Sequence, residues 1–333
     1  MAGDFSTLPI IDISALIKGA AERLNVADQS ARACRESGFF YITGHSIDDR
    51  LLQRLEELSR TFFARNSDEK LDIRMERGGS AWRGYFPVGG ELTSGKPDLK
   101  EGLYFGAELD QDHPLVKSGT PMHGANLFPK NIPLFRETVL EYMAAMTRLG
   151  HKLMEGIALS LGLDESYFIE RYTSDPLILF RIFNYPPDSE EVSEPQSWGV
   201  GAHTDYGLLT ILKQDRTGGL QVKSKSGWVD AKPIPGSFVC NIGDMLDRMT
   251  GGLYRSTAHR VRSPSRHARL SFPFFFDPNF NAEVKPIAVN APIEDDRDER
   301  WDLTSVHDFS GTYGDYLLSK VSRVFPQLRR EVL

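Results

Sequence analysis

Two histidines and one aspartate are the residues of this chain best suited to bind a transition metal. His203 and Asp205 stand two positions apart in GAHTDYG, and His259 follows much later, in STAHRV. If GAHTDYG is a strand, side chains two positions apart share a face and can reach the same ion. Two imidazoles and one carboxylate on one face of an octahedron leave three positions open, as in iron(II) oxygenases. We therefore predict a metal site at these three residues.

A second pair of polar residues lies in the strongly apolar run RLSFPFFF. Arg269 and Ser271 again stand two positions apart, so they share a face if this run is a strand. A guanidinium and a hydroxyl together suit a small carboxylate, because they offer a planar fork of donors and one adjustable donor. An arginine in such a run needs an anion nearby, since an unpaired buried charge is costly. The anion is either a ligand or one of the 46 acidic residues of the chain.

The elements that must position these residues are short strands in the second half of the chain. After Asp175, β-branched and aromatic runs alternate with Gly and Pro turns: LILFRIFNY, LLTIL, LQVK, SFVCNIG, STAHRVR and RLSFPFFF. Short strands at this spacing predict an antiparallel sandwich or barrel.

Helical patterns lie on both sides of this β region. Apolar residues at three- and four-residue steps, together with Pro and Gly at helix ends, predict helices in residues 20–37, 48–64, 133–162 and 304–333. FFYIT, between the first two helices, is predicted to be a strand. Residues 78–131 are rich in Gly, Pro and single aromatics without a clear period, so we expect binding loops there.

Composition and charge narrow the class of protein. The chain has 333 residues, of which 40% are hydrophobic and 26% charged, as in ordinary globular proteins. A net charge of -7 argues against nucleic acid or an anionic membrane as the main partner. Only two cysteines occur, and neither a secretory signal nor a membrane-length apolar run is visible. We therefore expect a cytoplasmic protein without a disulfide framework.

The combined motifs resemble the isopenicillin N synthase-like branch of the 2-oxoglutarate and iron(II)-dependent dioxygenases. The resemblance rests on HTD, HRV and R-L-S, and on LPIIDIS, ARACRESGFFYITGH, GGLQV, NIGDML and VFP. It implies a mainly β fold with flanking helices, a double-stranded β-helix or distorted jelly roll. Residues 1–130 would then brace the core and cover the barrel mouth. Residues 131–333 would hold the long helix, the catalytic core and the carboxy-terminal helix, in one compact unit.

The same resemblance implies roles for individual residues. The three predicted metal ligands match the family's iron ligands, and Arg269 and Ser271 match residues that bind the distal carboxylate of 2-oxoglutarate. Tyr185, in FNYPP, matches a tyrosine that also reaches this cosubstrate, whereas Phe183 replaces an asparagine of the family. The implied reaction uses O2 to convert 2-oxoglutarate into succinate and CO2 while a small-molecule metabolite is hydroxylated or desaturated. No catalytic residue beyond the metal ligands is implied.

Strand alternation extends the predicted site towards the substrate. If Tyr185 points into the barrel, then Phe183 and Arg181 point the same way, and Arg181 can receive an anionic or hydroxylated group. A structural ion pair of Arg181 is the alternative. The irregular region adds further candidates for substrate contact or for loop anchoring, namely Trp82, Arg83, Tyr85 and Tyr104.

Other functions share parts of this pattern. An iron(II) oxidase of the same superfamily that does not use 2-oxoglutarate keeps a similar triad and R-x-S pair, and succinate release separates the two. A non-enzymatic, metal-binding cupin-like protein would be favoured by loss of a ligand, and none is missing. A zinc hydrolase fits the triad but does not explain Arg269 and Ser271. The sequence indicates neither the substrate nor the oligomeric state.

Overall fold

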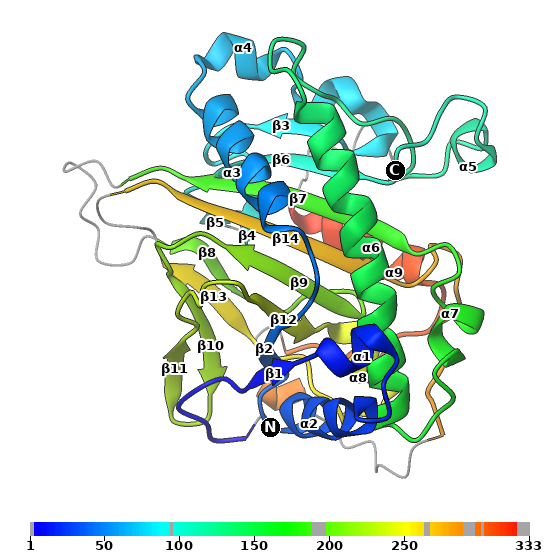
Figure 1. The fold of residues 1–333 in the computed structure, drawn as a ribbon. Helices are drawn as coiled ribbons and strands as arrows, with labels where there is room; N and C mark the ends of the chain where they lie inside the picture. Colours follow the sequence, from blue (N-terminus) through cyan, green and yellow to red (C-terminus); the bar gives the residue numbers. More distant parts are fainter. Residues whose placement is uncertain are drawn as a thin grey trace.

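Two β-sheets enclose the centre of the molecule in the computed structural model, which describes residues 3–93, 96–187, 198–262, 267–288, 297–300 and 303–324 (Figure 1). Within these residues the major sheet has the order β1 (Ile10–Asp12), β2 (Phe39–Thr43), β12 (Phe238–Ile242), β9 (Leu209–Gln214), β14 (Arg269–Asp277), β7 (Leu177–Tyr185), β6 (Glu101–Gly106) and β3 (Gly84–Phe86). The minor sheet has the order β11 (Gly227–Asp230), β10 (Leu220–Ser224), β13 (His259–Arg262) and β8 (Trp198–His203). A small hairpin of β4 (Leu92–Thr93) and β5 (Lys96–Pro97) forms a separate two-stranded sheet. The expected jelly roll is confirmed.

Strands β7 and β14, neighbours in the major sheet, are buried on both faces, which explains their nearly continuous apolar sequence. Odd-numbered residues of β7 and β14 point into the space between the sheets, where they line a cavity. Even-numbered residues point outwards into a helical layer. Phe180 of β7, for example, packs 4.9 Å from the ring of Tyr142 on helix α6 (Phe135–Ser160).

Helix α6 covers the outer face of the major sheet, as Figure 1 shows. It contacts β9, β14 and two amino-terminal helices, α2 (Arg23–Glu36) and α3 (Asp49–Phe63). Gly150 allows this close approach, because a Cβ atom there would lie 2.4 Å from the ring of Phe276 on β14. The other α-helices are α1 (Ser14–Lys18), α4 (Ser67–Leu71), α5 (Pro114–Lys117), α7 (Tyr167–Arg171), α8 (Asp244–Met249) and α9 (Tyr313–Val324). Short 3-10 helical segments lie at Met75–Ala81, which is kinked at Gly79, and at Arg297–Glu299 and Val306–Asp308.

The structure contains the helices and strands that the sequence predicts, with one substantial difference. Residues 78–131 are not only loops, because β3 and β6 lie within them and extend the major sheet beyond β7. The short, glycine-flanked EGLYFG of β6 has no clear period of its own, and its partner β7 supplies the pairing. The predicted last helix begins at Tyr313 rather than near Thr304, and residues 325–333, including most of VFP, lie outside the described residues.

Strands from the amino-terminal region complete the same sheet as the carboxy-terminal core. β2 pairs with β12 and β6 pairs with β7, both antiparallel. Within the described part of the chain, none of the helices combines the length and apolar character required to span a bilayer.

Candidate active site

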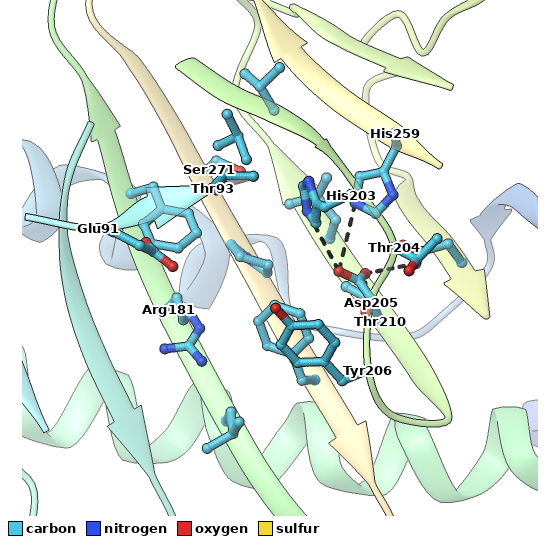
Figure 2. A pocket seen from close by; sticks show the side chains of 18 of the residues that line it. Glu91, Thr93, Arg181, His203, Thr204, Asp205, Tyr206, Thr210, His259 and Ser271 are labelled. Atoms are coloured by element: carbon cyan, nitrogen blue, oxygen red, sulfur yellow. Dashed lines mark hydrogen bonds and ion pairs between the residues drawn. The ribbon is translucent and has the colours of Figure 1, made fainter. Parts of the chain in front are cut away.

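The predicted metal ligands converge between the two sheets. His203, at the end of β8, lies directly opposite His259, at the start of β13, in the register of the minor sheet. The Nε2 atoms of His203 and His259 lie 3.8 Å and 3.7 Å from Oδ1 of Asp205. One potential ligand atom from each residue lies within 4.8 Å of the others, a separation that one shared metal ion accommodates. Figure 2 shows the three side chains pointing toward one another.

Both imidazoles are oriented by the backbone. Nδ1 of His203 lies 2.9 Å from the carbonyl oxygen of Gly201, and Nδ1 of His259 lies 3.3 Å from that of Thr257. A carbonyl can only accept, so each Nδ1 donates its proton there and each Nε2 keeps its lone pair for a metal. Burial, with the nearby His203, lowers the pKa of His259 to about 4, so this ring is neutral at neutral pH.

Asp205 reaches the site by a different route from the one that the sequence predicts. Strand β8 ends at His203, so Asp205 lies in the following turn, and strand alternation does not explain its position. The start of α8 holds this turn instead. The backbone amides of Gly243, Asp244 and Met245 donate to the carbonyls of Leu208, Asp205 and Gly207. A Cβ atom at Gly243 would lie 2.4 Å from the Gly207 carbonyl, so the contact leaves no room for a side chain.

The two carboxylate oxygens of Asp205 have different surroundings. Oδ2 accepts hydrogen bonds from Thr210 Oγ1 at 2.6 Å and Asn241 Nδ2 at 2.7 Å. Oδ1 faces the two histidines, which leaves it as the metal-binding oxygen. Burial alone would raise the pKa of Asp205, but His259, His203 and the two donors together hold it below its ordinary value. The carboxylate is therefore ionised, as a metal ligand must be.

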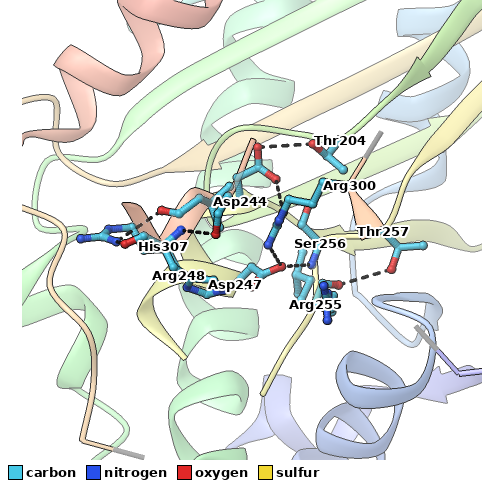
Figure 3. A network of polar contacts seen from close by, with 12 residues as sticks. Thr204, Asp244, Asp247, Arg248, Arg255, Ser256, Thr257, Arg300 and His307 are labelled. Carbon is cyan, nitrogen blue, oxygen red and sulfur yellow. Dashed lines mark hydrogen bonds and ion pairs between the residues drawn. The ribbon is translucent and has the colours of Figure 1, made fainter. Parts of the chain in front are cut away.

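A polar network centred on α8 braces the loops that carry the ligands (Figure 3). Asp244 accepts hydrogen bonds from Thr204, between two ligands, and from Tyr316 of α9, at 3.3 Å and 2.7 Å. One turn later, Asp247 accepts the backbone amide of Ser256, which lies shortly before His259, and pairs with Arg300 at 2.9 Å. Helix α8 thus connects both ligand-bearing segments to the carboxy-terminal part of the fold.

Arg269 lies in the same cavity, on the inward face of β14. Its side chain is 1% exposed, and none of its three guanidinium nitrogens has a hydrogen-bond partner among the described residues. Tyr185 lies directly across from it on β7, with its ring centroid 4.8 Å from Arg269 Cζ. Ser271 is the next inward residue of β14. A buried guanidinium that lacks a hydrogen-bond partner among the described residues, next to a hydroxyl group, fits the carboxylate of a bound ligand.

A cavity of about 460 Å³ contains the metal ligands, Arg269, Ser271 and Tyr185 together. Arg181 and Phe183 line it too, so these side chains point inwards as alternation along β7 predicts. The cavity also has apolar lining residues, among them Phe39, Val200, Leu212, Leu220 and Val261. The volume is sufficient for a small organic cosubstrate together with a metabolite.

Arg181 lies close to two aromatic rings on the cavity wall. Its Cζ lies 3.5 Å from the ring centroid of Tyr104 on β6 and 5.4 Å from that of Phe275 on β14. The structural ion pair that the sequence left open is not formed, because no described carboxylate lies within ion-pair distance of Arg181. The guanidinium is therefore available to a ligand, and Tyr104 acts as its platform.

Two of the candidates from the irregular region of residues 78–131, Arg83 and Tyr85, do not line the cavity. The Arg83 guanidinium is 1% exposed and donates to the carbonyl of Met122 at 2.7 Å. Tyr85 donates to the Glu101 carboxylate at 2.6 Å, next to the Lys70–Glu101 ion pair. These positions do not suit contact with a substrate, because the side chains of Arg83 and Tyr85 make internal contacts that anchor the amino-terminal region. The neighbouring Trp82 is buried as well.

The jelly roll and the two-histidine, one-carboxylate site define a non-haem iron oxygenase, and comparisons with known proteins specify its family. Residues 8–131 match the model of the non-haem dioxygenase in morphine synthesis N-terminal domain, and residues 168–278 match that of the 2OG-Fe(II) oxygenase superfamily. The chain belongs to this superfamily.

Relatives along nearly the whole chain carry oxidoreductase names. A "Probable iron/ascorbate oxidoreductase" of Dictyostelium discoideum is 53% identical, covering 98% of this chain and 97% of its own. A 1-aminocyclopropane-1-carboxylate oxidase of Dictyostelium mucoroides is 39% identical (97% and 96% covered). A homoarginine-6-hydroxylase of Glycine max is 37% identical (98% and 100% covered).

A solved structure supports the same conclusion. Neurospora crassa T7H, in complex with alpha-KG and thymine, superposes with a TM-score of 0.78 at 27% identity, covering 95% of this chain and 96% of that one. The protein is accordingly an oxidoreductase of the 2-oxoglutarate-dependent dioxygenase type, and its cofactors are Fe(II), 2-oxoglutarate and O2.

Proposed function

We propose that this protein hydroxylates a small metabolite that carries a carboxylate group. In this proposal His203, Asp205 and His259 hold Fe(II), and Arg269, Ser271 and Tyr185 hold 2-oxoglutarate. The observation that carries the proposal is the guanidinium of Arg269, which is buried in the same cavity as the metal ligands and has no hydrogen-bond partner among the described residues. Bound iron and 2-oxoglutarate supply the oxidising chemistry, in which decarboxylation to succinate and CO2 is coupled to hydroxylation of a C–H bond.

The protein's own groups orient these partners. The Nδ1–carbonyl hydrogen bonds fix the tautomer of both imidazoles, and Asn241 and Thr210 occupy one oxygen of Asp205 so that the other faces the metal. Arg269 provides the charge that a distal carboxylate requires, and the apolar side chains that line the cavity exclude water from the ligand.

Arg181 is the group that we assign to the substrate. It lies on the wall opposite the metal ligands in Figure 2, and no described carboxylate lies within ion-pair distance of it. Two kinds of relative act by name on homoarginine and on 1-aminocyclopropane-1-carboxylate, and both compounds carry a carboxylate. These names support a carboxylate on the substrate of this protein.

Succinate release tests the assigned activity. Purified protein with Fe(II), 2-oxoglutarate and O2 is supplied in turn with homoarginine, 1-aminocyclopropane-1-carboxylate and a panel of other carboxylates. We expect one succinate for each hydroxylated product with at least one of them. Product formation without succinate would instead indicate an oxidase that does not use 2-oxoglutarate.

The role of Arg181 is tested separately. Arg181→Leu should raise the substrate KM about 10- to 100-fold, because it removes one charged hydrogen-bonding group. The 2-oxoglutarate Kd should stay unchanged, since Arg269 is intact. Arg65→Leu, which alters an exposed ion pair with Glu69, serves as the matched control. Equal substrate KM values for Arg181→Leu and the control would remove Arg181 from the substrate site.

A further inference from the structure

We propose that the substrate is a zwitterion of the α-amino acid type, with its carboxylate on Arg181 and its ammonium on Glu91. Its side chain then points towards the metal. This inference rests on the proposed function, because it concerns the substrate of the same cavity. It adds Glu91 as a specificity-determining residue, and it states which end of the substrate is oxidised.

Glu91 reaches the cavity from the hairpin that closes one side of it. Glu91, Leu92 and Thr93 all line the cavity, and β4 contacts β8 and α9. The contact with β8 is close, since a Cβ atom at Gly201 would lie 3.3 Å from the Thr93 side chain. In Figure 2 the Glu91 carboxylate lies on the same side of the cavity as Arg181, across from His203, Asp205 and His259. An anionic and a cationic group are therefore neighbours on the wall remote from the metal.

On this wall one cation is paired with two carboxylates, while a second cation is paired with none of the described carboxylates. The fully buried Lys100 is shared by two carboxylates, with Nζ 2.9 Å from Glu91 and in contact with Asp98. Asp98 has a second donor, the hydroxyl of Thr93, at 2.8 Å. Among the described residues, Arg181 has no carboxylate within ion-pair distance. Burial alone would raise the pKa of Glu91, but Lys100 and Arg181 hold it below its ordinary value, so the carboxylate is charged.

A zwitterion resolves this uneven pairing. Its carboxylate gives Arg181 an anion and its ammonium gives Glu91 a cation, while Lys100 keeps Asp98. The buried wall then contains matched pairs and remains neutral. A simple carboxylate adds one uncompensated negative charge in a poorly solvated cavity, and a simple amine adds a positive charge next to Arg181; both are unfavourable.

The position of these two groups determines the site of oxidation. With the carboxylate and ammonium held on the wall opposite the metal ligands, the α-carbon is kept away from the metal and the far end of the side chain approaches it. The new hydroxyl group therefore forms on a distal side-chain carbon. One oxygen atom of O2 enters this hydroxyl and the other enters succinate, while 2-oxoglutarate supplies the two remaining electrons and leaves as succinate and CO2.

The test compares each amino acid with two analogues that lack one charge. Homoarginine, lysine and arginine, with their des-amino and decarboxylated analogues, are titrated anaerobically into the protein loaded with Fe(II) and 2-oxoglutarate. Perturbation of the visible charge-transfer band gives Kd. We expect at least one amino acid to bind about 10- to 100-fold more tightly than either analogue, as one charged contact implies.

Two variants of the same charge cluster separate recognition from structural effects. Glu91→Gln should weaken the amino acid about 10- to 100-fold but leave its des-amino analogue unchanged. Asp98→Asn removes the other carboxylate that contacts Lys100. It should therefore change the Kd of the amino acid and that of its des-amino analogue by equal factors. Glu69→Gln, outside the cavity, should preserve the wild-type preference.

The outcomes are distinct from those that test the proposed function. If no amino acid binds more tightly than its des-amino analogue, or if Glu91→Gln weakens both equally, the zwitterion inference is wrong even though succinate is still released. Hydroxylation at the α-carbon, located by mass spectrometry of the product, would refute the orientation. A protein that binds no 2-oxoglutarate at all would instead refute the proposed function.

Discussion

Replacing Arg269 with methionine should have opposite effects on cosubstrate binding and on the stability of the free protein. The side chain is 1% exposed and its nitrogens have no partner in the described part of the chain. Breaking a buried ion pair by removing one partner costs about 3 to 5 kcal/mol. The 2-oxoglutarate Kd should therefore rise roughly 10²- to 10³-fold. In the free protein, however, the substitution removes a buried charge that has no counter-ion among the described residues, so the free energy of unfolding should stay equal or increase.

Two measurements check this pair of effects. Anaerobic titration with Fe(II) and 2-oxoglutarate, followed by the visible charge-transfer band, gives the Kd. Thermal unfolding gives the stabilisation by the cosubstrate, about 2.7 kcal/mol at a concentration of 100 times the wild-type Kd. At that same concentration a variant weakened 100-fold retains only about 0.4 kcal/mol.

Arg248→Met is the matched control for this experiment. Arg248 is also buried, but it donates to the carbonyls of Val306 and His307 at 3.3 Å and 2.7 Å. Its loss should destabilise the protein by about 1 to 3 kcal/mol and leave the 2-oxoglutarate Kd unchanged. The reasoning fails if Arg269→Met destabilises the free protein as much as Arg248→Met, or if it leaves cosubstrate binding intact.

Three further predictions concern the surroundings of the site. Asn241→Leu removes a donor from Asp205 and should weaken Fe(II) binding about 10- to 100-fold in a metal titration, whereas an unchanged Kd would show that Thr210 alone orients the carboxylate. Burial raises the pKa of Asp277 from 3.8 to about 7, so the folded protein keeps a proton that the unfolded chain releases between these values. The free energy of unfolding should therefore fall as pH rises through this window. Asp277→Asn should reduce the difference between the free energies of unfolding measured at about pH 5 and about pH 8. An equal pH dependence in the variant and the wild type would exclude this carboxyl group as its source. Gly150→Ala places a Cβ atom 2.4 Å from the Phe276 ring and should cost about 1 to 3 kcal/mol in urea unfolding; no loss would mean that α6 shifts freely on the sheet.

The fold was predictable where local pattern and tertiary pairing agree. The runs that became β7 and β14 are apolar, β-branched and aromatic, and their length and composition suit strands buried on both faces. β6 was not predictable in this way, because EGLYFG is short and glycine-flanked and is held by its pairing with β7. Long-range pairing of this kind leaves no periodic signal in the sequence.

The site shows the same division between what local spacing predicts and what tertiary contacts decide. Alternation along β7 correctly places Arg181 and Phe183 in the cavity with Tyr185. Asp205 also meets the two histidines, but through a turn held by the start of α8, which the spacing of the chain does not reveal. Arg83 and Tyr85 were candidates for either substrate contact or loop anchoring, and only the structure shows that neither lines the cavity, because polarity in a loop region does not distinguish a ligand contact from an internal anchor. Glu91 was missed because a single glutamate in an irregular segment has no distinguishing pattern.

The division of the site between two sheets has a mechanical consequence. Both histidine ligands belong to the minor sheet, whereas Arg269 belongs to the major sheet. A cosubstrate that chelates the metal at one end and contacts Arg269 at the other links the two sheets directly. The spacing between the sheets is then set by the length of that small molecule as well as by side-chain packing. Cosubstrate binding should therefore reduce the motion of the two sheets relative to each other. A cosubstrate analogue one carbon shorter or longer should alter the rigidity of the whole barrel.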